Sequence, residues 1–421
     1  MKVGIIGSGG REHAICFELN KSQKIEQIYC FPGNAGTSIL AKNILLNLED
    51  FNELKNFIRL NKIDLIIVGP EKPLVDGLVD FLEKHKIKVF GPNKIASQLE
   101  GSKIFTKKLC EKYNIPTAKF GIFNNKDEAN IFIQQNNYPL VIKADGLASG
   151  KGVYICANAD EARFAVKEIF NGKFGEAKNL LIEEFLEGEE MSYFIISDGK
   201  TIKSFETAQD HKRVLEGDKG KNTGGMGAYS PSRLIDNELE NKILKKIINP
   251  TIKGLKDIGT NYKGFLYAGL MVINNEPYLI EYNVRMGDPE CQTILPKLKS
   301  DLLDIFVACC VEKLDEIEIE WHNNMKSLCV VLCSKGYPDT FKKNILIKNI
   351  NKVKLSRNEY CYHAGTSKVE GDIYAVGGRV LNFVCVSENF LQSREKIYNL
   401  INSLDWNGGF YRKDIGYKVI N

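Results

Sequence analysis

Lys143-Ala-Asp-Gly-Leu-Ala-Ser-Gly-Lys-Gly-Val153 is the most informative segment of this chain. It follows the apolar run Leu140–Ile142 and contains three glycines around a second lysine, Lys151. Glycines allow backbone N–H groups to approach phosphate oxygens closely, and the two lysines add positive charge. The segment therefore predicts a strand that opens into a phosphate-binding loop.

A second segment, Glu281-Tyr-Asn-Val-Arg285, follows another apolar run that ends at Ile280. The two-residue periodicity of a strand places Glu281 and Asn283 on the same face. A carboxylate and an amide oxygen are hard ligands of the kind that Mg²⁺ prefers. A phosphate-binding loop and a magnesium site on separate strands together predict ATP-dependent chemistry.

Two other nucleotide-binding patterns fit the sequence poorly. A P-loop requires G-x-x-x-x-G-K-[ST], but residues 146–152 are one residue too short between the glycines and have glycine after the lysine. The turn at residues 7–13 has Glu12 where a dinucleotide-binding turn has its third glycine, and no acidic residue ends the next strand. This turn is better suited to a phosphate monoester held at the start of a helix.

The composition is that of an ordinary globular protein. The 421 residues are 43% hydrophobic and 26% charged with a net charge of +4, and the tightest basic cluster, Lys242–Lys246, lies on a predicted helix. The 11 cysteines form no C-x-x-C pair, which indicates buried thiols in a reducing compartment. No segment approaches the ~18 apolar residues of a membrane span, and a strand begins the chain in place of a signal peptide. We expect a cytoplasmic monomer or weak homodimer with small-molecule substrates and no nucleic-acid or membrane partner.

The first hundred residues alternate between strand and helix patterns. This alternation predicts a doubly wound parallel sheet with helices on both faces. The expected strands are Val3–Ile6, Ile25–Phe31, Leu65–Val68 and Val89–Phe90, and the expected helices are Arg11–Asn20, Phe51–Asn61 and Leu74–Lys86.

The rest of the chain divides into three parts. A compact α/β unit is expected at about 120–190, followed by a larger mixed segment and then by a C-terminal α/β part. The expected strands are Ser192–Ser197, Phe265–Ile273, Tyr278–Tyr282, Ser327–Cys333, Tyr360–His363 and Ala375–Phe383, with a helix at Leu391–Ile401.

Several of these segments occur together in one enzyme superfamily. The chain resembles the ATP-grasp superfamily in a set of residues taken together: Lys103, Lys143, the loop 146–152, the acidic segment 183–190 and the pair at 281 and 283. Within it, the chain is similar along its whole length to the phosphoribosylamine–glycine ligase family, also called glycinamide ribonucleotide synthetases. The motifs that carry this likeness are Met1–His13, Pro32–Thr37, Val68–Glu71, Leu99–Lys103, Ile142–Gly146, Gln209–Arg213, Asn222–Pro231, Gly264–Gly269, Gly287–Glu290, His363–Thr366, Gly377–Arg379 and Tyr411–Gly416.

The resemblance implies a domain order and a reaction. It implies a phosphoribosylamine-binding domain at 1–101, an ATP-grasp core at 102–119 and 191–325, a lid subdomain at 120–190 that closes over ATP, and a C-terminal mixed α/β domain at 326–421. The implied reaction belongs to de novo purine biosynthesis. Glycine attacks the γ-phosphate of ATP to give glycyl phosphate, from which 5-phosphoribosylamine displaces phosphate to give glycinamide ribonucleotide.

The resemblance also implies roles for individual residues. Glu281 and Asn283 would bind Mg²⁺ or Mn²⁺, and Arg285, Lys143 and Asp210 would be catalytic. The implied ATP contacts are Lys103, Lys143, Gly146, Ser149, Gly150, Lys151, Gly152, Glu183, Phe185, Leu186 and Glu190. The implied contacts with the other substrates are Gly9, Gly10, Arg11, Asn34, Ala35, Gly36, Thr37, Lys212, Arg213, Thr223, Gly224, Gly225 and Arg285.

The sequence leaves three alternatives open. Many ATP-grasp enzymes carry a further metal-binding carboxylate on the strand before the Glu-x-Asn pair, but residues 267–273 contain none. Glu290 and Gln292 could instead serve as supplementary metal ligands. Each could equally be a structural hydrogen-bonding group. Another ATP-grasp carboxylate–amine ligase, or a carboxylase of nucleotide metabolism, would use the same ATP site. A catalytically silent ATP-binding protein would be expected to lose the metal ligands or Arg285, and this chain keeps all three.

Overall fold

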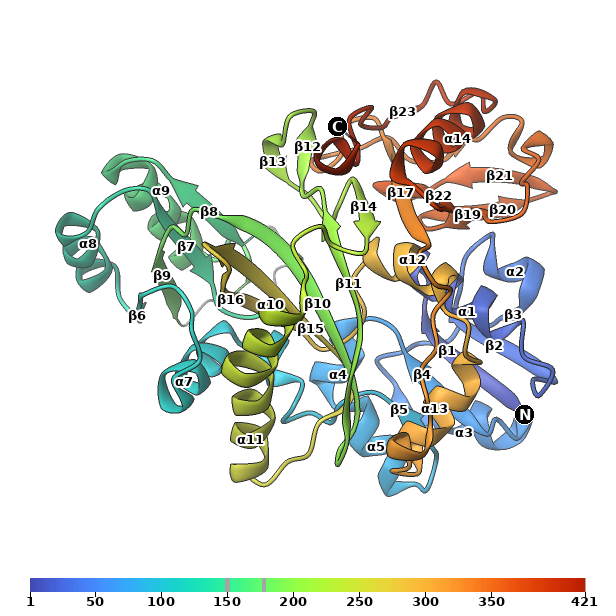
Figure 1. Cartoon of the computed structure of the whole chain (residues 1–421), viewed down its shortest axis with the longest axis horizontal. Helices are drawn as coiled ribbons and strands as arrows, with labels where there is room; N and C mark the ends of the chain where they lie inside the picture. Colours follow the sequence, from blue (N-terminus) through green and yellow to red (C-terminus); the bar gives the residue numbers. More distant parts are fainter. Residues whose placement is uncertain (148–151, 176–178, 421) are drawn as a thin grey trace.

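Figure 1 shows a computed structural model of the chain, which describes residues 1–147, 152–175 and 179–420. The N-terminal domain contains a five-stranded parallel sheet in the order β3-β2-β1-β4-β5. Its strands are β1 (Lys2–Gly7), β2 (Gln27–Pro32), β3 (Lys42–Asn43), β4 (Leu65–Val68) and β5 (Val89–Phe90). The strand order reverses between β1 and β4, and crevices at the carboxyl ends of such strands are where ligands bind in this kind of sheet.

Five helices accompany this sheet. They are α1 (Gly10–Leu19), α2 (Thr37–Leu40), α3 (Phe51–Asn61), α4 (Glu71–Asp76) and α5 (Leu78–Lys84). The prediction of one continuous helix at Leu74–Lys86 is wrong, because Gly77 adopts φ 95° and separates α4 from α5. That left-handed conformation suits glycine and ends a helix, so the chain turns at this point.

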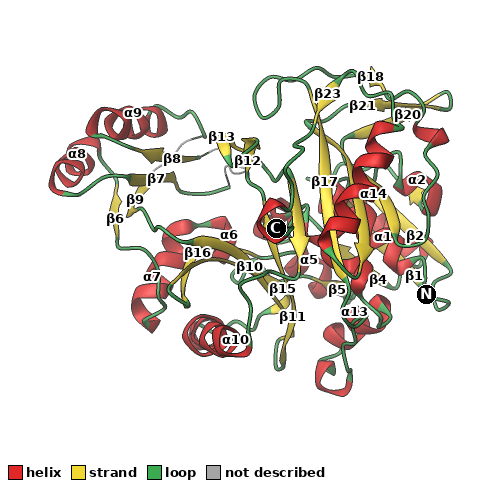
Figure 2. Cartoon of the chain, turned by 45° about the horizontal axis from the view of Figure 1, so that its top comes forward, coloured by secondary structure: helices red, strands yellow, loops and turns green. Residues whose placement is uncertain are grey.

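A small subdomain stands apart from the rest of the molecule (Figures 1 and 2). The linking helices α6 (Gln98–Gly101) and α7 (Lys103–Tyr113) lead into its four-stranded antiparallel sheet, ordered β6-β9-β7-β8. Its elements are β6 (Phe120–Phe123), α8 (Lys126–Gln135), β7 (Leu140–Ala144), β8 (Val153–Cys156), α9 (Ala159–Phe170) and β9 (Leu180–Glu184). The buried side chains of α8 and α9 pack on this sheet as a core of their own.

The centre of the molecule is one long sheet that passes through two sequence regions. Its main path is β16-β15-β10-β11-β14-β17-β22-β19. The strands are β10 (Glu189–Asp198), β11 (Ile202–Asp210), β14 (Gly227–Ser230), β15 (Lys263–Ile273), β16 (Glu276–Asn283), β17 (Lys326–Ser334), β19 (Glu359–His363) and β22 (Arg379–Ser387). Residues Gly227–Ser230 of β14 pair with Ser327–Val330 of β17, so the sheet continues directly into the C-terminal region.

Helices and short strands surround this sheet. They include α10 (Asn237–Ile243), α11 (Asn249–Asp257), α12 (Glu290–Ile294), α13 (Leu302–Cys310), α14 (Phe390–Asn402), β18 (Ile345–Leu346), β20 (Thr366–Val369), β21 (Asp372–Ala375) and β23 (Gly409–Phe410). A π-helical turn, Leu244–Ile248, joins α10 to α11, and the basic cluster there pairs with Glu276 through Lys242 and Lys246. Such ion pairs are typical of a solvated helix face.

The predicted strand Ala375–Phe383 is in fact two strands. β21 ends at Ala375 and β22 begins at Arg379, and the residues between them form a turn. A Cβ atom at Gly365 would lie only 2.4 Å from the Cα of Gly377, so the close approach of these two glycines requires that neither has a side chain.

The C-terminal tail anchors a hairpin beside the central sheet. β12 (Arg213–Leu215) and β13 (Lys219–Asn222) form the hairpin. The guanidinium of Arg412, which is 1% exposed, pairs with Asp218 of the hairpin at 2.9 Å and with Asp414 at 2.7 Å. The N–H of Gly416 donates to Nε2 of His211 at 3.1 Å. These bonds fix the segment that leads from β11 into the hairpin.

Buried contacts join the N-terminal domain, the central sheet and the C-terminal region. One core contains Val3 and Ile5 of β1, Phe306 of α13 and Val330 of β17, and a second joins β4 to β10 and β15. No described residue of the small subdomain belongs to the buried part of either core. None of the helices in the described ranges is long and apolar enough to cross a membrane.

Candidate active site

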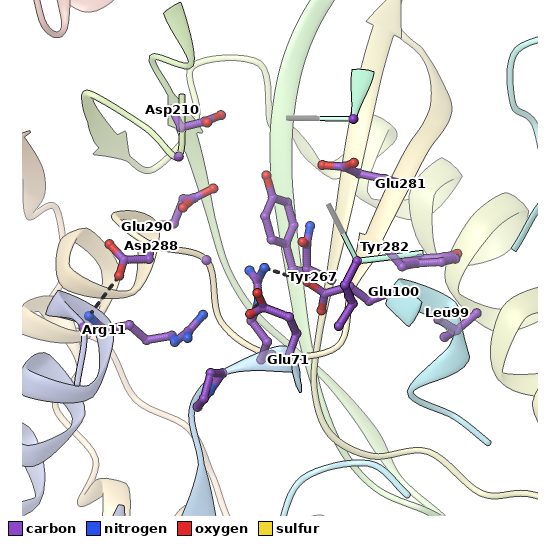
Figure 3. A pocket seen from close by; sticks show the side chains of 18 of the residues that line it. Arg11, Glu71, Leu99, Glu100, Asp210, Tyr267, Glu281, Tyr282, Asp288 and Glu290 are labelled. Atoms are coloured by element: carbon purple, nitrogen blue, oxygen red, sulfur yellow. Dashed lines mark hydrogen bonds and ion pairs between the residues drawn. The ribbon is translucent and has the colours of Figure 1, made fainter. Parts of the chain in front are cut away.

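A cavity of about 600 Å³ lies where the three larger parts of the molecule meet the small subdomain. Its walls come from β1 and α1 of the N-terminal domain, β7 and β9 of the subdomain, β16 of the central sheet and β22 of the C-terminal region. Figure 3 shows Asp210, Glu290 and Asp288 on one side of this cavity and Glu281 on the other.

Three lysines form one wall of the cavity, which we call the nucleotide side. Nζ of Lys143 lies 2.9 Å from Glu183, and Nζ of Lys107 lies 3.3 Å from the other oxygen of the same carboxylate. Nζ of Lys103 donates to the carbonyl of Gly146 at 2.9 Å. Burial lowers the pKa of Lys103 and of Lys107, and the neighbouring Lys143 adds to this effect. Two of these ammonium groups share a single carboxylate, so the wall can accept further negative charge.

The start of the predicted phosphate loop is tied to helix α7. Asp145 accepts hydrogen bonds from the hydroxyl of Ser102 at 3.1 Å and from the N–H of Ile104 at 3.3 Å. Ser102 in turn caps the helix by accepting from the N–H of Phe105 at 3.1 Å. Gly146 and Gly152 line the cavity, whereas Ser149, Gly150 and Lys151 lie outside the described residues.

A smaller pocket of about 180 Å³ adjoins the nucleotide side. Its lining includes the predicted residues Glu183, Phe185, Leu186 and Glu190. Apolar side chains from both the subdomain and the central sheet complete it: Val141, Val153, Ile155, Met271, Leu279 and Ile280. A largely apolar pocket that shares Lys143 with the nucleotide side suits a purine ring attached to phosphates.

Glu281 and Asn283 line the cavity from the end of β16. The intervening Tyr282 also lines the cavity, but it is buried and its hydroxyl bonds to Thr251 at 2.5 Å. No hydrogen bond engages the side chain of Glu281 or Asn283 within the described parts of the chain, so their oxygens remain available. A carboxylate and an amide that face a phosphate site fit Mg²⁺, which is usually held by few protein ligands together with substrate phosphates.

The supplementary metal ligands considered from the sequence have other contacts. The carboxamide of Gln292 is buried and donates to Asp288 at 2.6 Å. Glu290 lines the cavity, but its carboxylate accepts from Ser192 at 3.2 Å. In the described ranges no three His, Cys, Asp or Glu side chains gather as a metal-binding cluster.

Arg285 lies at the centre of a network of charges from two domains. Its Nη2 donates to Glu100 at 2.6 Å, and its Nε lies 3.4 Å from Glu71. Its Nη1 donates to the carbonyl of Met286 at 3.3 Å, and Arg11 donates to the same carbonyl at 3.1 Å. Burial raises the pKa of Glu100 to about 7. Burial alone would also raise the pKa of Glu71, but Arg285 and Arg11 hold it below its ordinary value.

Asp210 is a second carboxylate of the cavity whose pKa lies near neutrality. Burial is the main cause that raises its pKa to about 7. Lys212 opposes this shift, and the carboxylates of Glu290 and Glu190 support it. Lys212 is itself bonded to Glu190 at 2.5 Å. A carboxylate with a pKa near neutrality can accept a proton and release it again during turnover.

The N-terminal loops contribute fewer cavity residues than expected. Gly9 and Arg11 line the cavity, but Gly10 does not. The buried carboxamide of Asn34 donates to the carbonyls of Ser8 and His363, both at 2.8 Å. Asn34 and its neighbours Ala35, Gly36 and Thr37 therefore support the loop from behind and are not among the lining residues.

The hairpin region likewise divides into lining and supporting residues. Lys212, Thr223 and Gly224 line the cavity. Arg213 points elsewhere and donates to the carbonyl of Gly220 at 2.8 Å, and Gly225 is also outside the lining.

Several lining residues had no role in the sequence analysis. They are Glu71, Glu100, Lys107, Tyr267, Asp288 and Arg379. Arg379 donates to the carbonyl of Gly224 at 2.5 Å and lies 3.3 Å from the carboxylate of Asp288. Except for Lys107, all of these residues lie inside or at the ends of the motifs quoted above, so motif membership was the available signal.

Three family models match consecutive parts of the chain. Their descriptions are the phosphoribosylglycinamide synthetase N domain, matching residues 1–100, the ATP-grasp (A) domain, matching residues 101–291, and the C domain, matching residues 327–418. The chain belongs to the phosphoribosylglycinamide synthetase family.

Individual relatives agree with this family. Proteins named phosphoribosylamine–glycine ligase from Brucella melitensis biotype 1 and Agrobacterium fabrum are each 45% identical over 421 residues, covering 100% of this chain and 98% and 99% of those proteins. The crystal structure of phosphoribosylamine–glycine ligase from Thermotoga maritima is 33% identical, with a TM-score of 0.84, 99% of this chain and 100% of that chain covered. The biotin carboxylase domain of Hydrogenobacter thermophilus 2-oxoglutarate carboxylase, at 16% identity, a TM-score of 0.74 and coverage of 97% and 91%, shares the fold. The family confirms the expected ATP-grasp architecture.

Proposed function

We propose that this chain catalyses the ATP-dependent ligation of glycine to 5-phosphoribosylamine in de novo purine biosynthesis. The products are glycinamide ribonucleotide, ADP and phosphate. The observation that carries the proposal is the single cavity in which the lysines of the nucleotide side and Glu281 and Asn283 face Arg285 and the N-terminal loop at Gly9. Membership of the synthetase family supports the choice of substrates.

The first step is phosphoryl transfer to glycine. A carboxylate oxygen of glycine attacks the γ-phosphorus of ATP, the bond to the bridging oxygen breaks, and ADP leaves with that electron pair. Lys103 and Lys143 hold the phosphates, and Arg285 neutralises charge on the transferring group, because positioning and charge compensation dominate this chemistry. Glu281 and Asn283 would hold Mg²⁺ or Mn²⁺, which would supply further neutralisation of the phosphate charge.

The second step is acyl transfer from glycyl phosphate. The amine of 5-phosphoribosylamine attacks the acyl carbon, and the carbon–oxygen bond to phosphate breaks. The attacking nitrogen must lose one proton, and we assign Asp210 as its acceptor, which a pKa of about 7 supports. Gly9 and Arg11 at the start of α1 would hold the phosphate of 5-phosphoribosylamine, because a helix start binds anions well.

We assign the domains as follows: the phosphoribosylamine-binding domain is 1–101, the ATP-grasp core is 102–119 and 191–325, the lid is 120–190 and the C-terminal domain is 326–421. Phe185, Leu186, Glu183 and Glu190 would bind the adenosine, with the lid covering it. We further propose a cytoplasmic location, which is in keeping with this metabolic role.

A coupled ADP-release assay tests the reaction. ADP release should require both glycine and 5-phosphoribosylamine, and bicarbonate should not replace glycine. Release that depends on bicarbonate would favour a carboxylase, and no release with any of these substrates would contradict the proposal. Calorimetry should also show ATP binding that depends on Mg²⁺, and its absence would contradict the assignment of Glu281 and Asn283.

A further inference from the structure

Glu100 connects the linker between two domains to the end of β16. It lies in α6, with its side chain 9% exposed. One carboxylate oxygen accepts from Nη2 of Arg285 at 2.6 Å, and the other accepts from the backbone N–H of Val284 at 2.8 Å. Both bonds reach the residues that directly follow the proposed metal ligand Asn283, although 185 residues separate Glu100 from Arg285.

The second carboxylate near Arg285 holds it less tightly. Glu71 lies 3.4 Å from Nε of Arg285, and Nε makes no hydrogen bond within the described residues. Glu71 also faces Arg11, which helps to lower its pKa. The short bond to Glu100 is therefore the main restraint on the orientation of the guanidinium.

This arrangement leaves part of Arg285 free for substrate. A guanidinium has five N–H donors. One hydrogen of Nη2 goes to Glu100, one of Nη1 goes to Met286, and the Nε hydrogen faces Glu71. The remaining hydrogens on Nη1 and Nη2 are not used by these three partners, and Arg285 lines the cavity.

We propose that Glu100 is a positioning residue for phosphoryl transfer: it orients Arg285 and, through Val284, the end of the strand that carries Glu281 and Asn283. The proposal rests on the proposed function. Burying a carboxylate between two domains carries a desolvation penalty, and apolar packing at the same place would give equal or greater stability. A fixed guanidinium, in contrast, requires an acceptor of this kind. Arg285 is expected to act mainly in the transition state, so a loss of its orientation should lower kcat more than it weakens ATP binding.

The test compares two substitutions at one position. In Glu100→Gln, the side chain keeps one acceptor and presents an N–H to the other donor, so one of the two bonds is lost. We expect kcat for glycine-dependent ADP release to fall about 10²-fold, as for a misplaced catalytic group, while the calorimetric Kd for MgATP changes less than about threefold. Glu100→Asp keeps both acceptors on a shorter side chain and should recover part of the rate, to a loss of about tenfold.

Glu83→Gln is the matched control. The carboxylate of Glu83 pairs with Lys263, which joins the same two domains outside the cavity lining. This variant should keep kcat within about twofold, as expected for a partly exposed ion pair.

Three results would overturn the inference. They are an unchanged kcat in Glu100→Gln, a parallel loss of kcat and MgATP affinity, and an equal loss of kcat in Glu83→Gln. If Glu100→Gln does not fold, Glu100→Asp decides. A fall in kcat at constant MgATP affinity would support the inference, and an unchanged kcat would overturn it. A wild-type protein without glycine-dependent ADP release would instead overturn the proposed function.

Discussion

The two sides of the cavity differ in how their charges are balanced. On the side that we call the substrate side, each arginine already has a carboxylate partner: Arg285 with Glu100, Arg379 with Asp288 and Arg11 with Glu12. On the nucleotide side, Lys107 and Lys143 share Glu183, and Lys103 bonds to a backbone carbonyl.

The packing of the two sides differs in the same way. The substrate side lies between the N-terminal domain, the central sheet and the C-terminal region, which share buried cores. The nucleotide side lies between the central sheet and the small subdomain, whose core is separate. We infer that the groups of the substrate side are oriented before any ligand binds, whereas ATP completes the charge balance and the packing of the nucleotide side.

The largest expected effect is on the substrate side. Arg285→Ala should lower kcat for ADP release by about 10³-fold, because an arginine that neutralises a transferring phosphoryl group contributes on this scale. The KM for ATP should change only a few-fold. Arg285→Lys keeps the charge but loses the planar fork, so it should recover only a small part of the rate. Equal changes in kcat and KM would contradict an oriented substrate side.

Asp210 gives the next largest effect, and it depends on pH. As a base, its carboxylate acts only when deprotonated, so with a pKa of about 7 the amine-transfer rate should rise about tenfold from pH 6 to pH 8 and level off above pH 8. Asp210→Asn should lower the rate about 10²-fold and remove this pH dependence. Single-turnover measurements of amide formation across this pH range give the amine-transfer rate. A variant that kept the wild-type pH profile would assign the base elsewhere.

Lys107 tests the nucleotide side and should show a smaller effect. In Lys107→Met, Glu183 loses one of its two ammonium partners and should draw Lys143 away from the phosphates. The KM for ATP should rise several-fold at nearly constant kcat, which corresponds to a loss of about 1 kcal/mol in binding free energy. Calorimetry with MgATP gives an independent measurement. A large fall in kcat would show that the two sides are not distinct.

The smallest effect on catalysis is expected from the contact between the N-terminal domain and the C-terminal region. The N–H of His363 donates to Nδ1 of His13 at 2.8 Å, and burial lowers the pKa of His13 to about 3 and of His363 to about 4. In the unfolded chain both would titrate near 6.5, so between pH 6.5 and 4 the unfolded state binds more protons and stability falls as pH falls.

The loss in the free energy of unfolding should reach about 2 kcal/mol per histidine at pH 5. Urea unfolding at pH 7 and pH 5 measures it, and His363→Gln should remove about half of the pH dependence. Substitution of the exposed His322 is the control, which should leave the pH dependence unchanged. Equal stability of the wild type at both pH values would contradict the prediction.

The sequence predicted the elements whose signals are local. The helix Phe51–Asn61 and the strands at β4 and β5 have the expected bounds. The breaks at Gly77 and at residues 376–378 were missed, because apolar periodicity continues through both and only the backbone conformation interrupts it. The continuity of the central sheet through β14 and β17 was also missed, since register between distant strands has no local signal.

The candidate site was predictable to a similar extent. Four predicted residues stand at strand or helix ends with recognisable spacing, and the structure brings them to one cavity. They are Lys103, Lys143, Glu281 and Asn283. Glu100 and Arg379 could not be assigned roles from spacing, because their partners lie 185 and 91 residues away. Asn34 was expected to face substrate, but its carboxamide bonds to the loops around it.

The anchor formed by Arg412 has a consequence for synthesis of the protein. A nascent chain that has emerged from the ribosome as far as residue 400 already contains all the side chains proposed to touch substrate. Its hairpin at 213–222 would still lack the guanidinium that neutralises Asp218 and the backbone donor that holds His211. Enzymatic competence should thus arise only after residues 412–416 have emerged, and deletions from Tyr411 onward should impair ligation although they remove no residue that lines the cavity.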